Sequence, residues 1–162
     1  MDTIAKIARP LLVIALIGIA GIFFLFFRFY QNDVKALEDF TAAYDKFDQA
    51  ISDFSGPVLA SNLEGAPAVD DLERKADEAL VDLKTKAAAR ISSLIKNDAE
   101  LMSITLEIAN LSSKELDNLK AYRRAVAGKN TDLDRLAKEF EDWTNKRRNA
   151  YVQFQELGGL KE

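Results

Sequence analysis

The sequence contains no histidine and no cysteine. Without cysteine the chain has no disulfides, thiolate nucleophiles or thiolate metal sites. Without histidine it lacks an essential part of serine–histidine and cysteine–histidine nucleophiles, of His-ligated haem, and of HExxH zinc and Glu-x-x-His di-iron sites. Only carboxylate, lysine or tyrosine chemistry remains, and no EF-hand or GxxxxGK[ST] motif accompanies the acidic residues. We therefore expect a protein that is not an enzyme and that holds no cofactor and no metal.

Basic residues are fewer than acidic ones: the chain has 22 Lys and Arg and 26 Asp and Glu, which gives a net charge of -4. An excess of acids disfavours non-specific attraction to a phosphate backbone, so nucleic acid is not an expected partner. With 162 residues the chain is long enough for one domain and an anchor.

One long apolar run stands out against this charged background. Residues 10–27, PLLVIALIGIAGIFFLFF, carry no charge and span about 27 Å as a helix, close to the thickness of a bilayer core. The alternative is a cleaved signal peptide, but the best small-residue cleavage site, at 34–36, lies far beyond the run. We predict an uncleaved signal anchor: a short tail at 1–9 and a transmembrane helix with interfacial aromatics at 10–30.

The end of this span is marked by Arg28, Phe29 and Tyr30. Aromatic residues concentrate at membrane interfaces, and a long arginine stem can reach the headgroups, so these three residues are predicted to lie at the interface. Gly18 and Gly21 place small residues mid-span without forming a GxxxG motif. They are candidates for contact with another helix, and the alternative is ordinary lipid-facing composition.

Lysine and arginine are nearly balanced across the predicted span, so the positive-inside rule barely decides the orientation. The free amino group and the short tail favour a cytoplasmic N-terminus, and acidic residues crowd the opposite side: Asp33, Glu38 and Asp39. We predict a single-pass membrane protein whose helical domain is extracytoplasmic, and periplasmic in a Gram-negative bacterium.

The remainder, residues 31–157, shows four amphipathic segments. The first, at about 31–54, carries a coiled-coil-like heptad seam of apolar residues: Leu37, Phe40, Tyr44, Phe47, Ile51 and Phe54. Gly56 and Pro57 are predicted to stop it, with a loop over 58–67. Because no turn signal follows Tyr30, the anchor is predicted to continue rigidly into this helix.

The other segments are predicted at about 70–95, 98–127 and 132–157, followed by a tail at 158–162. Asn97 with Glu100 forms a capping-box pattern at the start of the third segment, and Asn130 or Thr131 is the expected cap of the fourth. Within the third segment the spacing of the apolar residues changes near Ser112. A break at this point and an uninterrupted helix are equally expected. Short connections between similar segments predict an all-α, antiparallel up-down-up-down four-helix bundle.

This layout is similar to the extracytoplasmic bundles of bacterial chemoreceptor input domains, and to LemA-type proteins, which couple an N-terminal anchor to a helical bundle. The likeness is one of architecture and implies no particular function.

Two surfaces are candidates for partner binding. In the predicted topology seven bases gather near the membrane, although helix macrodipoles alone favour bases in last turns: Lys84, Lys86, Arg90, Lys96, Lys146, Arg147 and Arg148. Arg147 is distinctive because it occupies an apolar seam position. Met102 and Leu106 belong to a second apolar row on the third segment, which is either core or a docking patch.

The aromatic seams offer an alternative function. Tyr44 and Phe47 on the first segment and Trp143 and Tyr151 on the fourth are candidates for enclosing a small apolar molecule or lipid, as in a sensor module, although such rings are more often core. Our preferred expectation is a non-enzymatic structural or accessory subunit. Its expected partners are the lipid bilayer and either other membrane proteins or further copies of itself.

Overall fold

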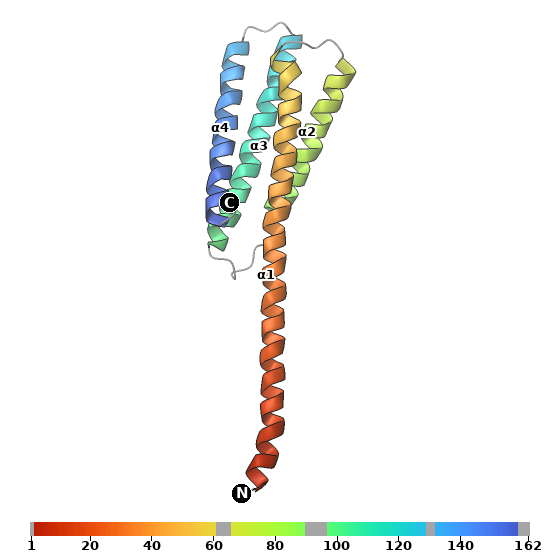
Figure 1. The fold of residues 1–162 in the computed structure, drawn as a ribbon. Helices are drawn as coiled ribbons and strands as arrows, with labels where there is room; N and C mark the ends of the chain where they lie inside the picture. Colours follow the sequence, from red (N-terminus) through yellow and green to blue (C-terminus); the bar gives the residue numbers. More distant parts are fainter. Residues whose placement is uncertain (1, 61–65, 90–96, 129–131, 159–162) are drawn as a thin grey trace.

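The computed structural model describes the backbone of residues 2–60, 66–89, 97–128 and 132–158, and side chains from residue 17 in the first range and residue 68 in the second. Four helices make up this part of the chain: α1 (Asp2–Leu59), α2 (Ala66–Ala87), α3 (Asp98–Ala127) and α4 (Leu133–Gly158). They pack as an up-down four-helix bundle, which confirms the all-α bundle part of the predicted fold class (Figure 1).

The bundle is built beside the C-terminal half of α1, while the N-terminal half extends away from the other three helices (Figure 1). α1 packs against α2 and α3, and α3 packs against α2 and α4. Large side chains also connect α1 and α4: the rings of Phe40 and Phe154 meet edge to face, with centroids 4.9 Å apart. The core therefore lies among the upper part of α1 and the three shorter helices.

α1 changes its environment without changing its secondary structure. Residues 17–32 are exposed on every side, whereas the predicted heptad seam from Leu37 to Phe54 is buried. Residues 10–16 of the predicted span lie outside the described side chains. Among the residues that the structure describes, no helix is long and apolar enough to cross a membrane.

The predicted end of the first helix is wrong. α1 continues through Gly56 and Pro57 to Leu59, and the amide of Ala60 still donates to the Gly56 carbonyl at 3.1 Å. Val58 is completely buried, and the apolar area it removes from water helps to offset the hydrogen bond that proline cannot make. The predicted loop is shortened at both ends, since Ala66 and Pro67 already belong to α2.

α2 also differs from its predicted bounds of 70–95. It begins at Ala66, where Pro67 is tolerated because first-turn amides have no intrahelical acceptor. It ends at Ala87, after which Ala88 and Ala89 form a turn. The continuation predicted over residues 90–95 lies outside the described residues.

α3 has the predicted bounds and runs without a break through Ser112. The Ser112 hydroxyl donates to the Ile108 carbonyl at 2.8 Å, so a buried polar side chain is satisfied by its own helix. Asn97 is the N-cap as predicted, but it adopts a left-handed conformation with φ 67° and makes no side-chain capping bond. The capping-box prediction at this position is therefore wrong.

The apparent phase shift in α3 arises because polar residues occupy core positions. The residues facing the core continue in steps of four and three through the supposed break: Leu101, Thr105, Ile108, Ser112, Glu115, Leu119 and Tyr122, all buried. The buried face of α3 is therefore continuous, although a pattern of apolar residues alone seems to break at Ser112.

α4 begins at Leu133 and ends at Gly158, each within one residue of the prediction. The Leu136 amide donates to the Asp132 carbonyl at 3.1 Å, which starts the helical ladder. The predicted caps Asn130 and Thr131 lie outside the described residues.

Candidate functional site

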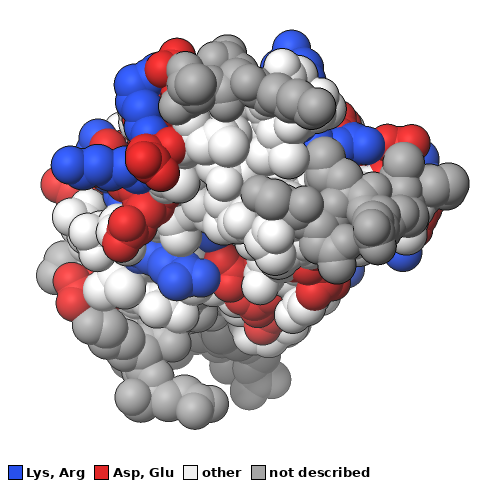
Figure 2. Space-filling view, turned by 90° about the horizontal axis from the view of Figure 1, so that it is seen from above, with Lys and Arg blue, Asp and Glu red and all other residues white. Residues whose placement is uncertain are grey.

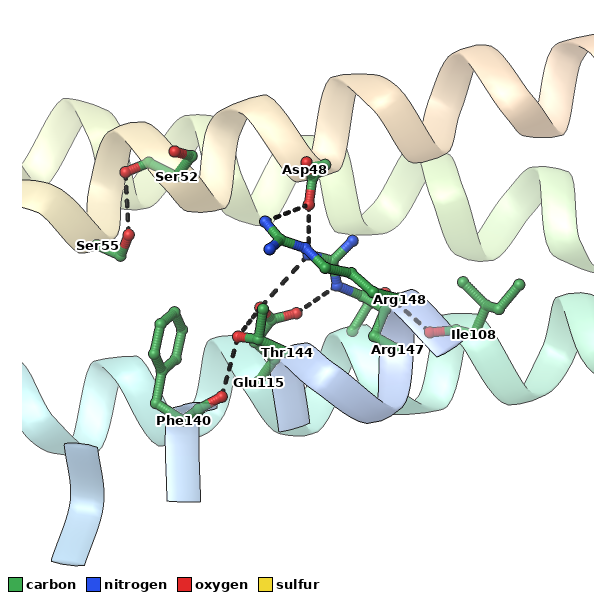
Figure 3. Close-up of polar contacts among 10 residues, drawn as sticks. Asp48, Ser52, Ser55, Ile108, Glu115, Phe140, Thr144, Arg147 and Arg148 are labelled. Carbon is green, nitrogen blue, oxygen red and sulfur yellow. Dashed lines mark hydrogen bonds and ion pairs between the residues drawn. The ribbon is translucent and has the colours of Figure 1, made fainter. Parts of the chain in front are cut away.

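The centre of the bundle holds a buried ion-pair network that joins three helices. Arg147 on α4 donates from Nε to Glu115 Oε2 on α3 at 2.5 Å, and from Nη2 to Asp48 Oδ1 on α1 at 2.5 Å (Figure 3). The side chains of Arg147 and Glu115 are 0% exposed, whereas that of Asp48 is 36% exposed. One guanidinium therefore bridges α1 and α3 from α4.

Two further side chains complete this network. Thr144, one turn before Arg147, places its hydroxyl 2.6 Å from Glu115 Oε1. Arg148 lies 3.7 Å from the outer carboxylate, Asp48, and is itself exposed (Figure 3). Two acids and two bases make the network electroneutral, which is the condition under which buried charges are tolerated.

Aromatic rings cover the guanidinium. Arg147 Cζ lies 5.0 Å from the Tyr44 ring centroid and 5.3 Å from that of Phe47, within the range of cation–π contact. Tyr44 in turn stacks on Tyr151, with centroids 3.6 Å apart and planes 5° from parallel. The network is thus enclosed by rings from α1 and α4.

This enclosure changes the acid–base properties of the site. Burial raises the pKa of Tyr44 to about 12, and the charge of Arg147 offsets part of that rise. Burial also raises the pKa of Tyr151. Burial alone would lower the pKa of Arg147, but the Glu115 carboxylate raises it above its ordinary value by charge and hydrogen bonding. Arg147 is therefore a permanent cation, and Tyr44 stays protonated at neutral pH.

The arrangement is suited to fixing helix positions. Both strongly buried charges are engaged with each other, so neither is poised to exchange a proton with a substrate. Removal of either partner would leave the other charge buried and alone, which is the costly state for an ion pair. Nη1 of Arg147 is buried without a hydrogen-bond acceptor, so even the intact network is not fully satisfied.

Among its described members, the predicted membrane-side cluster of bases is not a single surface, because Arg147 is buried. Arg147 lies in the core, Lys86 pairs with Asp39 at 3.3 Å, and Lys84 donates to Ser113 at 3.0 Å. Arg90 and Lys96 lie outside the described residues. Lys84 and Lys86 thus each contact a polar side chain on a neighbouring helix.

The remaining predicted site residues are placed as follows. Arg28, Phe29 and Tyr30 are exposed on the free part of α1, as are Gly18 and Gly21, where an added Cβ would meet no atom within 4 Å. On α3, Met102 is partly buried and Leu106 is 47% exposed. The apolar row on α3 is therefore partly core and partly surface.

Three of the four residues proposed to enclose a ligand come together. Tyr44 and Phe47 contact Arg147, and Tyr151 stacks on Tyr44, so protein atoms occupy the space between these rings. Trp143 instead contacts two lysines, Lys114 and Lys146, whose ammonium nitrogens lie 4.8 and 4.6 Å from its ring centroid.

The tip of the bundle, where α2 begins and α3 ends, is rimmed by charges of both signs (Figure 2). Lys120 contacts Asp77 at 2.6 Å, and Arg123 pairs with Asp70 and Glu73. These pairs tie α2 to α3, and their charges of both signs lie close together.

No protein-family model matches this sequence, and neither curated proteins nor solved structures show a significant similarity to it. Sequence reasoning singled out Arg147 but missed Glu115 and Asp48. A signal for Glu115 exists: an arginine at a core position requires a carboxylate at a core position on a neighbouring helix.

Proposed function

We propose that this protein is a non-enzymatic, membrane-anchored accessory subunit that docks on other membrane proteins through its helical bundle. Residues 10–27 form the anchor, the N-terminus is cytoplasmic, and the bundle stands on the extracytoplasmic side. Arg28, Phe29 and Tyr30 lie at the interface, where aromatic rings and a long basic side chain are favoured.

The observation that carries this proposal is the uninterrupted course of α1. Its exposed segment from Ile17 to Tyr30 presents large apolar side chains that are 51% to 70% exposed. Soluble surfaces rarely leave so much contiguous apolar area in water, so a lipid or protein cover is required. The same helix then enters the bundle core with no turn between the two environments.

The mechanism we propose is mechanical. A continuous helix fixes the height and the angle of the bundle above the bilayer, because bending it requires broken backbone hydrogen bonds. Within the bundle, Asp48 on α1 is bound by Arg147 on α4. The orientation set by the anchor is thereby transmitted to the helix farthest along the chain.

Contact with a membrane partner is proposed at two levels. Within the bilayer, Gly18 and Gly21 allow close approach of a second helix, since no neighbouring atom occupies the space beside them. Above it, Leu106 offers an exposed apolar side chain next to partly buried Met102. Either contact also suits a second copy of this chain.

The test is co-purification of the full-length protein from membranes in mild detergent. We expect a membrane protein to be recovered in fixed stoichiometry, and Leu106→Asp to reduce its recovery at least about fivefold, as burying an unpaired charge demands. The matched control is Val152→Asp on α4, where a side chain of similar exposure is replaced. A lone monomer from gentle extraction, or equal losses in both variants, would overturn the proposal.

A further inference from the structure

The Arg147 network leaves one accessible group of polar side chains between α3 and α4 unused. This group, here called the α3–α4 seam, consists of Lys114 and Asn118 on α3 and Glu139, Trp143 and Lys146 on α4. The two lysines are exposed, and Trp143 and Glu139 are partly exposed. None of these five side chains contacts Arg147 in the bonds and ring contacts described above.

The seam is built as two successive rungs between the helices. In one, Asn118 Nδ2 donates to Glu139 Oε2 at 3.0 Å. In the other, Lys114 Nζ lies 4.8 Å from the Trp143 ring centroid, and Lys146 Nζ lies 4.6 Å from it. Lys114 and Asn118 are one turn apart on α3, as Glu139 and Trp143 are on α4, so the rungs are neighbours.

Two groups in these rungs lack a partner. The residue Asn118 is only 9% exposed, and its carbonyl oxygen is buried without a hydrogen bond. Among the described residues, Lys114 contacts no carboxylate, and its ammonium rests only on the Trp143 ring. Lys114 is exposed, so its ammonium is available to a carboxylate of another molecule.

We infer that the α3–α4 seam binds an acidic segment of a partner protein. Carboxylates of that segment pair with Lys114 and Lys146. Trp143 supplies the apolar platform, which is the role in which tryptophan dominates protein interfaces. Lys146 is held by Asp142 at 2.6 Å, but that pair is exposed on both sides and is therefore easily exchanged.

The height of the seam selects a protein over a lipid. Lys114 and Lys146 are the chain neighbours of Glu115 and Arg147, which lie level with Asp48 on α1. Asp48 follows Arg28 by twenty residues of continuous helix, a rise of about 30 Å. The headgroup layer is only about 5–8 Å thick, so anionic headgroups in the anchoring membrane cannot reach the seam. This step rests on the proposed anchor.

The test uses the fluorescence of Trp143, the single tryptophan of the chain. The full-length protein in uncharged detergent is titrated with an octaglutamate peptide, and with octaglutamine as the neutral control. We expect a saturable change in Trp143 emission with octaglutamate alone, weakened by added salt because the contacts are ionic. The double variant Lys114→Gln/Lys146→Gln should bind about tenfold more weakly, and the matched control Lys138→Gln, an exposed lysine on α4, within about twofold of the wild type.

The inference is overturned if octaglutamate produces no saturable change, or if Lys138→Gln weakens binding as much as the double variant does. Circular dichroism of each variant separates loss of binding from loss of fold. Because detergent replaces the membrane here, a negative titration with intact co-purification would refute the seam alone. A positive titration with a lone monomer from membranes would refute the accessory role alone.

Discussion

Arg147 on α4 and Glu115 on α3 form an ion pair, with Nε and Oε2 2.5 Å apart, from which water is completely excluded. Such a pair adds little net stability compared with an apolar pair of the same volume, because both charges must be desolvated. The pair instead favours a single register of α4 against α3, because any slip between these helices leaves both charges buried without a partner.

The first prediction concerns this pair. Arg147→Met leaves Glu115 buried and uncompensated and should lower the free energy of unfolding by about 3–5 kcal/mol. Arg147→Met/Glu115→Leu removes both charges and should recover most of that loss. The measurement is urea unfolding followed by circular dichroism. Arg74→Met, which breaks exposed pairs with Asp71 and Glu78, is the control and should destabilise far less, because exposed ion pairs contribute little. A double variant as unstable as the single one would show that packing, and not charge pairing, explains the effect.

The second prediction concerns alkaline pH. Burial raises the pKa of Tyr44 to about 12, above the ordinary value of 10.0, so the folded state holds this proton more tightly than the unfolded state. Between pH 10 and 12 the folded protein binds more protons, and stability should fall as pH rises, by up to about 1.4 kcal/mol per pH unit. Below pH 10 this contribution is fully present. Tyr44→Phe should flatten the decline.

The measurement is phenolate absorbance of the wild type and of Tyr44→Phe across the same pH range. The difference between the two titrations isolates Tyr44, whose absorbance should rise well above pH 10. If the difference rises with a midpoint at 10, Tyr44 is not held protonated by its surroundings.

The third prediction concerns the junction between the exposed part of α1 and the bundle. Gln31 and Asn32 are exposed, so their side chains can be changed without disturbing the core. Gln31→Gly/Asn32→Gly weakens the helix locally by about 1 kcal/mol, whereas Gln31→Ala/Asn32→Ala strengthens it, so the two variants differ by about 2 kcal/mol. The glycine variant should lose recovery of the membrane partner while remaining folded and in the membrane fraction. Full recovery with the glycine variant would make rigidity at this junction irrelevant.

The arrangement of helices was readable from the sequence because apolar residues at steps of three and four mark the buried faces. The bounds of α3 and α4 followed from the same pattern together with the glycines at positions 128 and 158. The end of α1 did not follow, because the burial of Val58 outweighs the local signal of Gly56 and Pro57. Local propensity is a weak guide where tertiary burial acts in the opposite direction.

The central network was only partly readable. Arg147 was conspicuous as a base at an apolar seam position, but Glu115 was hidden because polar Ser112 and Glu115 seemed to end the seam that they continue. Asp48 lies beside the seam of α1, and only the three-dimensional packing brings it to Arg147. Pairings across helices depend on rotation and register, which a single sequence does not contain.

The central proposal is that residues 10–27 anchor the chain with the bundle outside the cytoplasm. Because the protein has no cysteine, single cysteines can report topology through a membrane-impermeant maleimide. With any outer barrier opened and the inner membrane intact, Lys138→Cys on α4 should be labelled. Thr3→Cys should be labelled only after the membrane is dissolved. Labelling of Thr3→Cys before lysis, or protection of Lys138→Cys until lysis, would contradict the account.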